Sequence, residues 1–490
     1  MEANNELPKW LIFIPIIIIL VSRTVPFLFF EAPLGYDTGL YRKTIEIYQS
    51  SLPYLPSGVD QIGIFLITDL LGLFGFSIDQ ILFGFHILAD LFLGIGIYIL
   101  VKKFFNLNAA IYSFFLFAVS VTQFQAYWFM FYKNILALFL MLVSFWLLKK
   151  KSWLVIPVAG FMGGVHSMTF FLFVLIFIAH FVFNRHKKYC FISGISILFV
   201  ALSLYIYNFS GILNLFPEVN PSKLFQPEVI YGGRFFDFSA YLHLSVFYFP
   251  FAVLGFIYLI KKREFDYLFF WFLINFLIVY LGFFFHNRFI VFLDIIAIIL
   301  AGAAIDKILN RISLNIYPAE NSCRKTGITN DKIIVRAMAR TANIIPFNGV
   351  YNKIAVLILI FGMIYFLMGN VLSTKPLISK GELNEIKSLD TVTEENAFVM
   401  STISHYSPWI YGYSGRKTIA PGLFQYDTKW SREEWDIFWA TDDLEIRHNL
   451  LDRYEKPLYI FVGDWQEELR FKFDRDPALV KYSKRVYKYK

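Results

Sequence analysis

Charged residues are scarce in this sequence. Only 17% of the 490 residues are Asp, Glu, Lys or Arg, whereas 57% are hydrophobic. Soluble domains carry about 25% charged residues and about 45–50% apolar ones, so this chain has too few charges to cover a water-soluble fold of its size. The shortage excludes an ordinary soluble globular protein and indicates that lipid is its main solvent.

Cysteine is also scarce, and several motifs are missing. Cys190 and Cys323 are the two cysteines of the chain, and they imply no disulfide framework and no metal-ligand spacing. The sequence has no nucleotide-phosphate loop, nucleophile elbow or zinc motif, which argues against an ATP-driven pump. It has no internal repeat, which counts against the common inverted-repeat transporters.

Aromatic residues are abundant, with 58 Phe, 29 Tyr and 10 Trp. Phe fills the hydrocarbon layer of a bilayer, and Tyr and Trp favour its two interfaces. The net charge is +8, but the Lys and Arg residues stand in short runs between apolar segments, which is typical of membrane topology. We therefore expect the lipid bilayer as a partner, and no nucleic acid.

Apolar segments that are long enough to cross a bilayer recur along the chain. A span needs about 20 apolar residues. Eleven segments are candidates: 9–29, 79–101, 108–126, 132–149, 152–166, 168–184, 190–210, 241–260, 267–285, 288–306 and 353–372. No small-residue cleavage site follows the first segment, so we interpret it as a retained span and not as a removed signal peptide.

Basic runs orient these spans. Lys149-Lys150-Lys151 and Lys261-Lys262-Arg263 follow even-numbered spans, and residues 307–352 add further Lys and Arg. Because excess Lys and Arg mark cytoplasmic loops, the pattern predicts a multi-pass cell-membrane protein. Its N-terminus is expected in the cytoplasm, and its C-terminal region is expected on the extracytoplasmic side.

The predicted architecture is a polytopic α-helical membrane domain, residues 1–374, followed by a small extracytoplasmic α/β domain, residues 375–490. In the tail, residues 397–401 and 458–462 have strand character, and residues 431–454 have helical character. The first outer loop, residues 30–78, contains a helical pattern over 37–50 and a short apolar segment over 61–76. We expect two helices that lie in the interface there, and a cytoplasmic loop over 307–352.

Asp37 is the main catalytic candidate. It lies in Gly35-Tyr36-Asp37-Thr38-Gly39-Leu40-Tyr41, just past the outer end of the first span, where a carboxylate stands at headgroup level. There it can take a proton from a hydroxyl while a lipid-linked phosphate leaves. The structural alternative is a helix N-cap, which is compatible because a cap fixes the position of the carboxylate. Tyr36 and Tyr41 are expected to contact the substrate.

Four basic side chains are expected at the same outer surface: Arg288, His286, Lys133 and His166. In His286-Asn287-Arg288, the guanidinium heads an apolar helix, where it can hold a phosphate with two hydrogen bonds. Lys133 lies at the outer end of the fourth span, and snorkelling is the alternative for both Lys133 and Arg288. His166, in the outer turn between the fifth and sixth spans, either lines a polar cavity or is structural.

Asp90 and Asp294 lie within spans and should face protein or water.

Two aromatic segments are candidates for a sugar or acceptor surface. Residues 231–237 combine aromatic rings with Arg234 and Asp237, and a packed interfacial loop is the alternative interpretation. The tail segment 407–413 contributes Trp409 and Tyr411, with the same two interpretations.

Together these features resemble the GT-C class of integral membrane glycosyltransferases, which includes protein mannosyltransferases, aminoarabinose transferases and oligosaccharyltransferase catalytic subunits. The resemblance depends on the acidic motif at Asp37, the two interfacial helices after it, the segments that begin at Lys133, Gly163 and Arg288, and the outer domain at the end. It covers nearly the whole chain at the level of layout. It implies that Asp37 is the catalytic base or a metal-associated acid and that Arg288 meets the donor phosphate.

Two departures from the class pattern matter. Trp409-Ile410-Tyr411-Gly412-Tyr413 resembles the Trp-Trp-Asp-Tyr-Gly signature of oligosaccharyltransferases, but it lacks the first Trp and the Asp, so recognition of a peptide sequon is not implied. Many class members carry Asp-Glu or Asp-x-Asp where this chain has Asp37-Thr38. The resemblance therefore implies no certain cofactor, and the candidate is a divalent metal, Mg²⁺ or Mn²⁺, held at Asp37.

We predict an inverting glycosyltransferase that moves a sugar from a polyprenyl- or dolichyl-phosphate donor to a hydroxyl of a glycan, protein or lipid acceptor. Asp37 is the base, and Arg288, with His286 or Lys133, stabilises the leaving phosphate. The alternative is a transporter or flippase for a lipid-linked or amphipathic solute, and a non-catalytic scaffold is a second rival. The large tail and the charged first loop disfavour transport, because alternating access needs neither.

Overall fold

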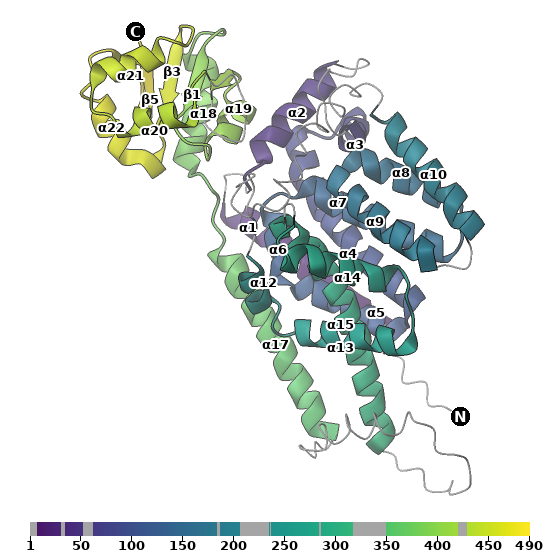
Figure 1. Ribbon diagram of the computed structural model, residues 1–490. Helices are drawn as coiled ribbons and strands as arrows, with labels where there is room; N and C mark the ends of the chain where they lie inside the picture. The colour runs from purple at the N-terminus through teal and green to yellow at the C-terminus, as the bar shows by residue number, and fades with distance from the viewer. Residues whose placement is uncertain are drawn as a thin grey trace, which may run out of the picture.

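The computed structural model describes residues 7–30, 35–51, 62–183, 187–205, 235, 237–283, 286–316, 349–419 and 429–490. Before residue 374 the described chain is mostly helical, and a small sheet with its own helices follows. Figure 1 shows the helices as a bundle, with the C-terminal sheet beside one end of it. The prediction of a mainly helical membrane protein with a small C-terminal α/β part is confirmed at this level.

The first span leads directly into the predicted outer helices. η1 (Lys9–Ile12) and α1 (Phe13–Phe29) form one apolar helix of 21 residues. α2 (Thr38–Ser51) and α3 (Ile62–Leu73) follow. α2 buries Tyr41, Ile45 and Tyr48, which recur along one face of the helix. α3 rises only about 18 Å, which is too short to cross the hydrocarbon layer.

The remaining helices of the bundle cover the other predicted spans. They are η2 (Gln80–Gly84), α4 (Phe85–Phe104), α5 (Leu107–Val119), α6 (Val121–Trp128), α7 (Tyr132–Lys149), α8 (Val155–Val165), α9 (Ser167–Phe183), α10 (Lys187–Ser203), α12 (Phe238–Leu244), α13 (Phe249–Lys262), α14 (Tyr267–Tyr280), α15 (His286–Ile316) and α17 (Gly349–Ser373). Within the described residues, four helices are long and apolar enough to cross a membrane, or up to six if each of two bent pairs is one span. Every predicted span contains a helix or a bent pair.

Two predicted spans are corrected to bent pairs of helices. In the span predicted over 108–126, α5 and α6 meet at 52° because the Ser120 hydroxyl accepts a hydrogen bond from the Gln123 backbone N–H and so caps a new helix. In the span predicted over 241–260, α12 and α13 meet at 98°, and Pro250 lies in the first turn of α13.

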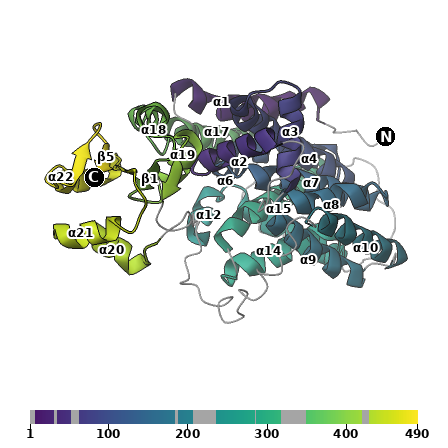
Figure 2. The ribbon, with the colours of Figure 1, turned by 90° about the horizontal axis from the view of Figure 1, so that it is seen from above.

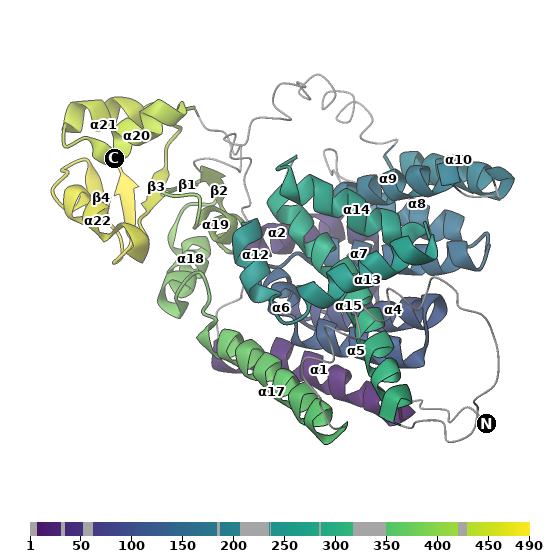
Figure 3. The same cartoon turned by 60° about the horizontal axis from the view of Figure 1, so that its bottom comes forward.

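Buried polar contacts tie the middle of the bundle together. α15 packs against α5, α13 and α14, and Figure 3 shows it at the centre of the helices. Asp294 on α15 accepts hydrogen bonds from the Ser120 hydroxyl at 2.9 Å and the Gln123 amide at 2.8 Å. Asp90 on α4 forms a fully buried ion pair with Arg23 on α1, with an N–O distance of 2.9 Å. Both carboxylates therefore face protein, as expected from their place within spans.

The C-terminal part is a five-stranded mixed sheet with helices around it. Its elements are α18 (Lys380–Val392), β1 (Phe398–Ser401), α19 (Ser407–Tyr413), β2 (Lys417–Ile419), α20 (Arg432–Ala440), α21 (Leu444–Leu451), β3 (Leu458–Phe461), η5 (Asp464–Gln466), α22 (Glu467–Phe473), β4 (Leu479–Lys481) and β5 (Val486–Tyr489). The strand order is β2-β1-β3-β5-β4, with β1 parallel to β2 and β3. The two predicted strands are confirmed as β1 and β3, and the predicted helical stretch as α20 and α21.

The C-terminal part touches the bundle through α19 and α2. Figure 2 shows α19 next to α2, with the sheet farther out. The two helices approach so closely that a methyl group on Gly39 would lie 2.6 Å from the carbonyl carbon of Pro408, and one on Gly412 would lie 2.6 Å from the carbonyl carbon of Gly39. Only glycine fits such a crossing. The contact places the C-terminal part directly beside the segment that carries Asp37.

Candidate active site

Asp37 lies immediately before α2, at the end that faces α19. Its backbone carbonyl accepts a hydrogen bond from the Tyr41 N–H at 2.9 Å, so it belongs to the first turn of the helix. The residue as a whole is partly exposed. Both of the interpretations made from the sequence, helix start and accessible carboxylate, are therefore compatible with its position.

Two cations from distant parts of the chain act on the Asp37 carboxylate. Burial raises the pKa of Asp37, and the positive charges of Arg288 and Lys133 oppose that rise. Arg288 lies in the first turn of α15 and Lys133 in the first turn of α7. The fold thus brings one acid and two basic groups, separated by up to 251 positions in the sequence, to the same end of the bundle.

Tyr41 and His166 border this group of charges. The Lys133 ammonium lies 5.4 Å from the centroid of the Tyr41 ring, a distance at which a cation–π attraction acts. His166 joins α8 to α9, and burial together with the charges of Lys133 and Arg288 lowers its pKa to about 3. Its Nδ1 lies within hydrogen-bond distance of the Thr169 hydroxyl, at 2.8 Å, and of the Thr169 backbone N–H, at 3.3 Å. His166 is therefore a neutral, hydrogen-bonded ring beside the charges.

The other residues proposed from the sequence lie in different surroundings. His286 is partly exposed in the first turn of α15, two residues before Arg288. Tyr411 is part of α19, and burial, together with the charge of Glu46 on α2, raises its pKa. Trp409 is fully buried in the core of the C-terminal part, so its ring offers no surface to an acceptor, and we assign it a structural role. Arg234 lies outside the described residues.

Sequence analysis missed two aromatic neighbours of the site. The Tyr36 hydroxyl donates a hydrogen bond to the Ser404 carbonyl at 2.9 Å, and its ring meets the edge of His405, with centroids 5.9 Å apart. His405 in turn lies 4.9 Å from the ring of Trp465. His405 follows β1 and Trp465 follows β3, and the carboxyl ends of neighbouring parallel strands meet at one edge of a sheet. That rule could have paired the two loops once β1 and β3 were known to be adjacent.

The side chains around Asp37 supply only part of a metal-ligand set. Within the described ranges, no group of three or more His, Cys, Asp and Glu side chains is close enough to hold an ion. The basic groups around Asp37 already supply positive charge where a metal would supply it. The described side chains do not form a metal centre by themselves.

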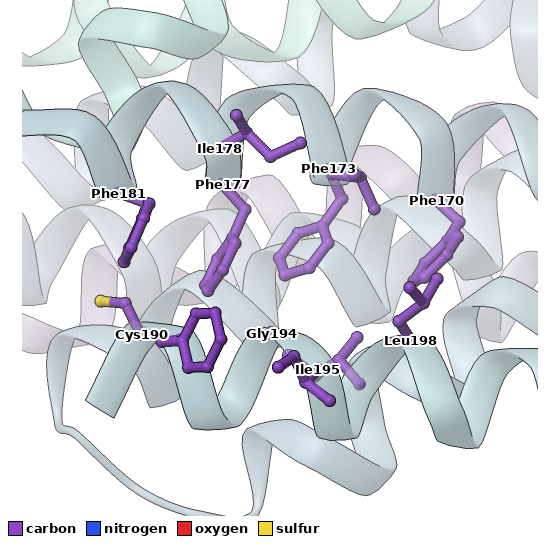
Figure 4. Close-up of a pocket in the computed structure, with 12 residues that line it drawn as sticks. Phe170, Phe173, Phe177, Ile178, Phe181, Cys190, Gly194, Ile195 and Leu198 are labelled. Atoms are coloured by element: carbon purple, nitrogen blue, oxygen red, sulfur yellow. The ribbon is translucent and has the colours of Figure 1, made fainter. Parts of the chain in front are cut away.

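An apolar groove begins near His166 and runs along α9 and α10. Its walls are Phe170, Phe173 and Phe177 from α9 and Gly194, Ile195 and Leu198 from α10, and its volume is about 210 Å³. Figure 4 shows the phenylalanine rings in a row above α10. Phe170 stands one helical turn from His166, and its N–H donates to the His166 carbonyl at 3.1 Å. One end of the groove therefore lies close to the charged group.

The sequence matches no protein-family model and no curated protein sequence. Solved structures do match over nearly the whole chain. The archaeal oligosaccharyltransferase AglB from Archaeoglobus fulgidus, in complex with an inhibitory peptide and a dolichol-phosphate, has 13% identity and a TM-score of 0.65, covering 96% of this chain and 71% of AglB. ArnT from Cupriavidus metallidurans in the apo state has 13% identity and a TM-score of 0.59, covering 98% of this chain and 97% of ArnT. The undecaprenyl phosphate-bound form of ArnT has a TM-score of 0.53. Both proteins are GT-C glycosyltransferases, so the chain has the fold that its sequence layout resembles.

Proposed function

We propose that this chain is an inverting membrane glycosyltransferase that uses a polyprenyl- or dolichyl-phosphate-linked sugar and works on the extracytoplasmic side. The observation that carries the proposal is the grouping of Asp37 with Arg288 and Lys133 at one end of the bundle. The fold shared with AglB and ArnT adds support, because those structures hold dolichol-phosphate and undecaprenyl phosphate.

Asp37 acts as the general base in this proposal. The acceptor O–H gives its proton to the Asp37 carboxylate while the oxygen forms a bond to the anomeric carbon of the donor sugar. The burial that raises the pKa of Asp37 makes the carboxylate a stronger base. The oxygen attacks from the side opposite the phosphate, so the anomeric configuration inverts.

Arg288 and Lys133 act on the leaving group. As the bond between the anomeric carbon and the phosphate oxygen breaks, the electron pair leaves with the lipid phosphate. A guanidinium and an ammonium that are already in place stabilise this charge without reorganisation. The neutral ring of His166 adds a polar group beside these two cations.

The proposed donor enters from the bilayer. Its apolar tail occupies the groove between α9 and α10, which begins one turn from His166 and is lined by aromatic rings. The proposed orientation is supported by charge. Lys133 opens α7 and Lys149 closes it about 24 Å away, so the basic run at 149–151 lies at the opposite end of the bundle from Asp37, where the positive-inside rule puts the cytoplasm.

Substitution of Asp37 tests the proposal. The purified full chain is incubated in lipid nanodiscs with a panel of polyprenyl-phosphate sugars, and donor loss and product are followed by mass spectrometry. Asp37→Asn should lower turnover by at least about 100-fold, the usual contribution of a general base. Asp79→Asn is the matched control, because Asp79 is an exposed carboxylate that pairs with Arg42 on α2. Full turnover in Asp37→Asn refutes the assignment.

The transporter alternative makes a different prediction. A flippase moves the intact lipid-linked sugar, so no free lipid phosphate forms. Two charged groups in the middle of the bundle, Arg23 and Asp90, bind each other in a fully buried pair, which fits a structural role for this pair. Movement of intact donor across the bilayer without any release of lipid phosphate would favour transport.

A further inference from the structure

Three aromatic rings lead away from Asp37 across the junction with the C-terminal part. Tyr36, next to Asp37, meets His405, and His405 meets Trp465. We refer to Tyr36, His405 and Trp465 as the aromatic platform. Tyr36 and His405 are partly exposed, and Trp465 is 64% exposed. An indole that folding leaves so open gains little from burial and offers its face to a ligand.

The loop that carries Trp465 is held by charged groups. The Asp464 carboxylate accepts hydrogen bonds from Arg485, at 2.9 Å to each of its oxygens, and from Arg470 at 2.9 Å. The Trp465 backbone N–H donates to the Tyr406 hydroxyl at 3.2 Å, and that hydroxyl donates to Glu382 at 2.6 Å. Trp465 is thus an exposed ring on a fixed backbone, as a binding surface requires.

We propose that the aromatic platform binds the acceptor, and that the acceptor is a saccharide whose ring stacks on Trp465 and whose reacting hydroxyl reaches Asp37 past Tyr36. This inference rests on the proposed glycosyl transfer. The apolar C–H face of a sugar ring packs on an indole, while its hydroxyls need hydrogen-bond partners at the edge of the ring. The half-exposed Asp464 carboxylate beside Trp465 provides one.

Two other occupants fit the platform less well. Insertion of Trp465 into lipid would drag Asp464 and Glu467 toward the hydrocarbon, which is unfavourable for charged groups. A peptide that adds as a strand is bound largely through its backbone groups, whereas this surface presents ring faces and a carboxylate. The continuity of the platform with Tyr36, adjacent to Asp37, also favours a substrate over a membrane contact.

The test measures binding and turnover separately. The full chain in nanodiscs is titrated with maltotriose, mannotriose and chitotriose, and binding is followed by saturation-transfer NMR. At least one trisaccharide should bind, and Trp465→Ala should weaken that binding about tenfold, whereas Trp465→Tyr should retain most of it. Phe471→Ala is the matched control, because Phe471 on α22 is also 64% exposed. With a productive acceptor, Trp465→Ala should raise the acceptor KM and leave the donor KM unchanged.

Several results would overturn the inference. The inference is refuted if no trisaccharide binds, or if Trp465→Ala and the wild type bind the trisaccharide equally well. It is also refuted if a hydroxyl-bearing peptide binds the platform and no saccharide does. Quenching of Trp465 fluorescence by brominated lipid, read as the difference between the wild type and Trp465→Phe, would assign the ring to the membrane. Asp37→Asn separates the two proposals, because it should bind saccharide normally while its turnover is lost. If it turns over normally, the proposed function fails, and the platform is judged by binding alone.

Discussion

The glycine crossing between α2 and α19 should control the position of Asp37. In Gly39→Ala, the new methyl group would lie 2.6 Å from the Pro408 carbonyl carbon and 3.1 Å from the Trp409 nitrogen. Carbon atoms in good contact stand about 3.5–4.0 Å apart, so the two helices must separate by about 1 Å. Overpacking of this kind costs about 1–3 kcal/mol.

The same displacement should lower the reaction rate. Gly39 is two residues from Asp37, and a displacement of about 1 Å at a reacting group can lower a rate about 100-fold. We expect Gly39→Ala to reduce the kcat of donor consumption by about 10- to 100-fold. Hydrogen exchange of the α19 amides, measured by mass spectrometry, should become faster because the helix loses its contact.

Two variants sharpen this test. Gly369→Ala on α17 is the control, because a methyl group there meets nothing within 4 Å. Gly412→Ala overpacks the same crossing from the other side, so the double variant should be little worse than either single one. Wild-type turnover and unchanged α19 exchange in Gly39→Ala would refute the claim that this crossing positions the base.

Two further predictions concern charge. Arg288→Lys keeps the charge but loses the paired hydrogen bonds to phosphate, so its kcat should fall about 10- to 100-fold. The control is Arg263→Lys, which should turn over normally because Arg263 is exposed at the end of α13. If Arg288→Lys turns over as fast as this control, Arg288 does not bind the phosphate. Asp69 on α3 is 5% exposed, and burial raises its pKa to about 6. Because the folded state holds this proton more tightly than the unfolded state, the stabilisation is complete below about pH 4 and is lost as the pH rises through about 6. Asp69→Asn should therefore flatten the fall in melting temperature between pH 4 and pH 7.5, a difference of about 2–3 kcal/mol, and an unchanged pH profile would contradict this account.

Hydropathy predicted the helices well because a span has a simple requirement, a long apolar run. It failed at the bends, because a bend depends on a few local groups. Ser120 with Gln123 three residues later is a capping pattern that can be recognised in a sequence, and Pro250 likewise indicates a helix start. Both signals stand inside apolar runs, where the hydropathy average conceals them.

The candidate site was predictable only where one residue carried the signal. Asp37 follows a span, and Arg288 and Lys133 open spans, so topology alone predicts that all three lie on one side of the membrane. The burial of Trp409 was not predictable, because a short aromatic segment does not reveal which face packs inward. His405 and Trp465 meet because β1 and β3 are neighbours in the sheet, which local sequence patterns do not specify.

The buried pair between Arg23 and Asp90 has a consequence for how the chain is made. α1 leaves the ribosome before α4 and carries an arginine whose partner is synthesised 67 residues later. A lone charge inside the hydrocarbon layer costs up to about 2.5–3.5 kcal/mol, so α1 is less stable in lipid until α4 arrives. The joining of these two helices removes that cost, which favours their pairing at an early step of assembly.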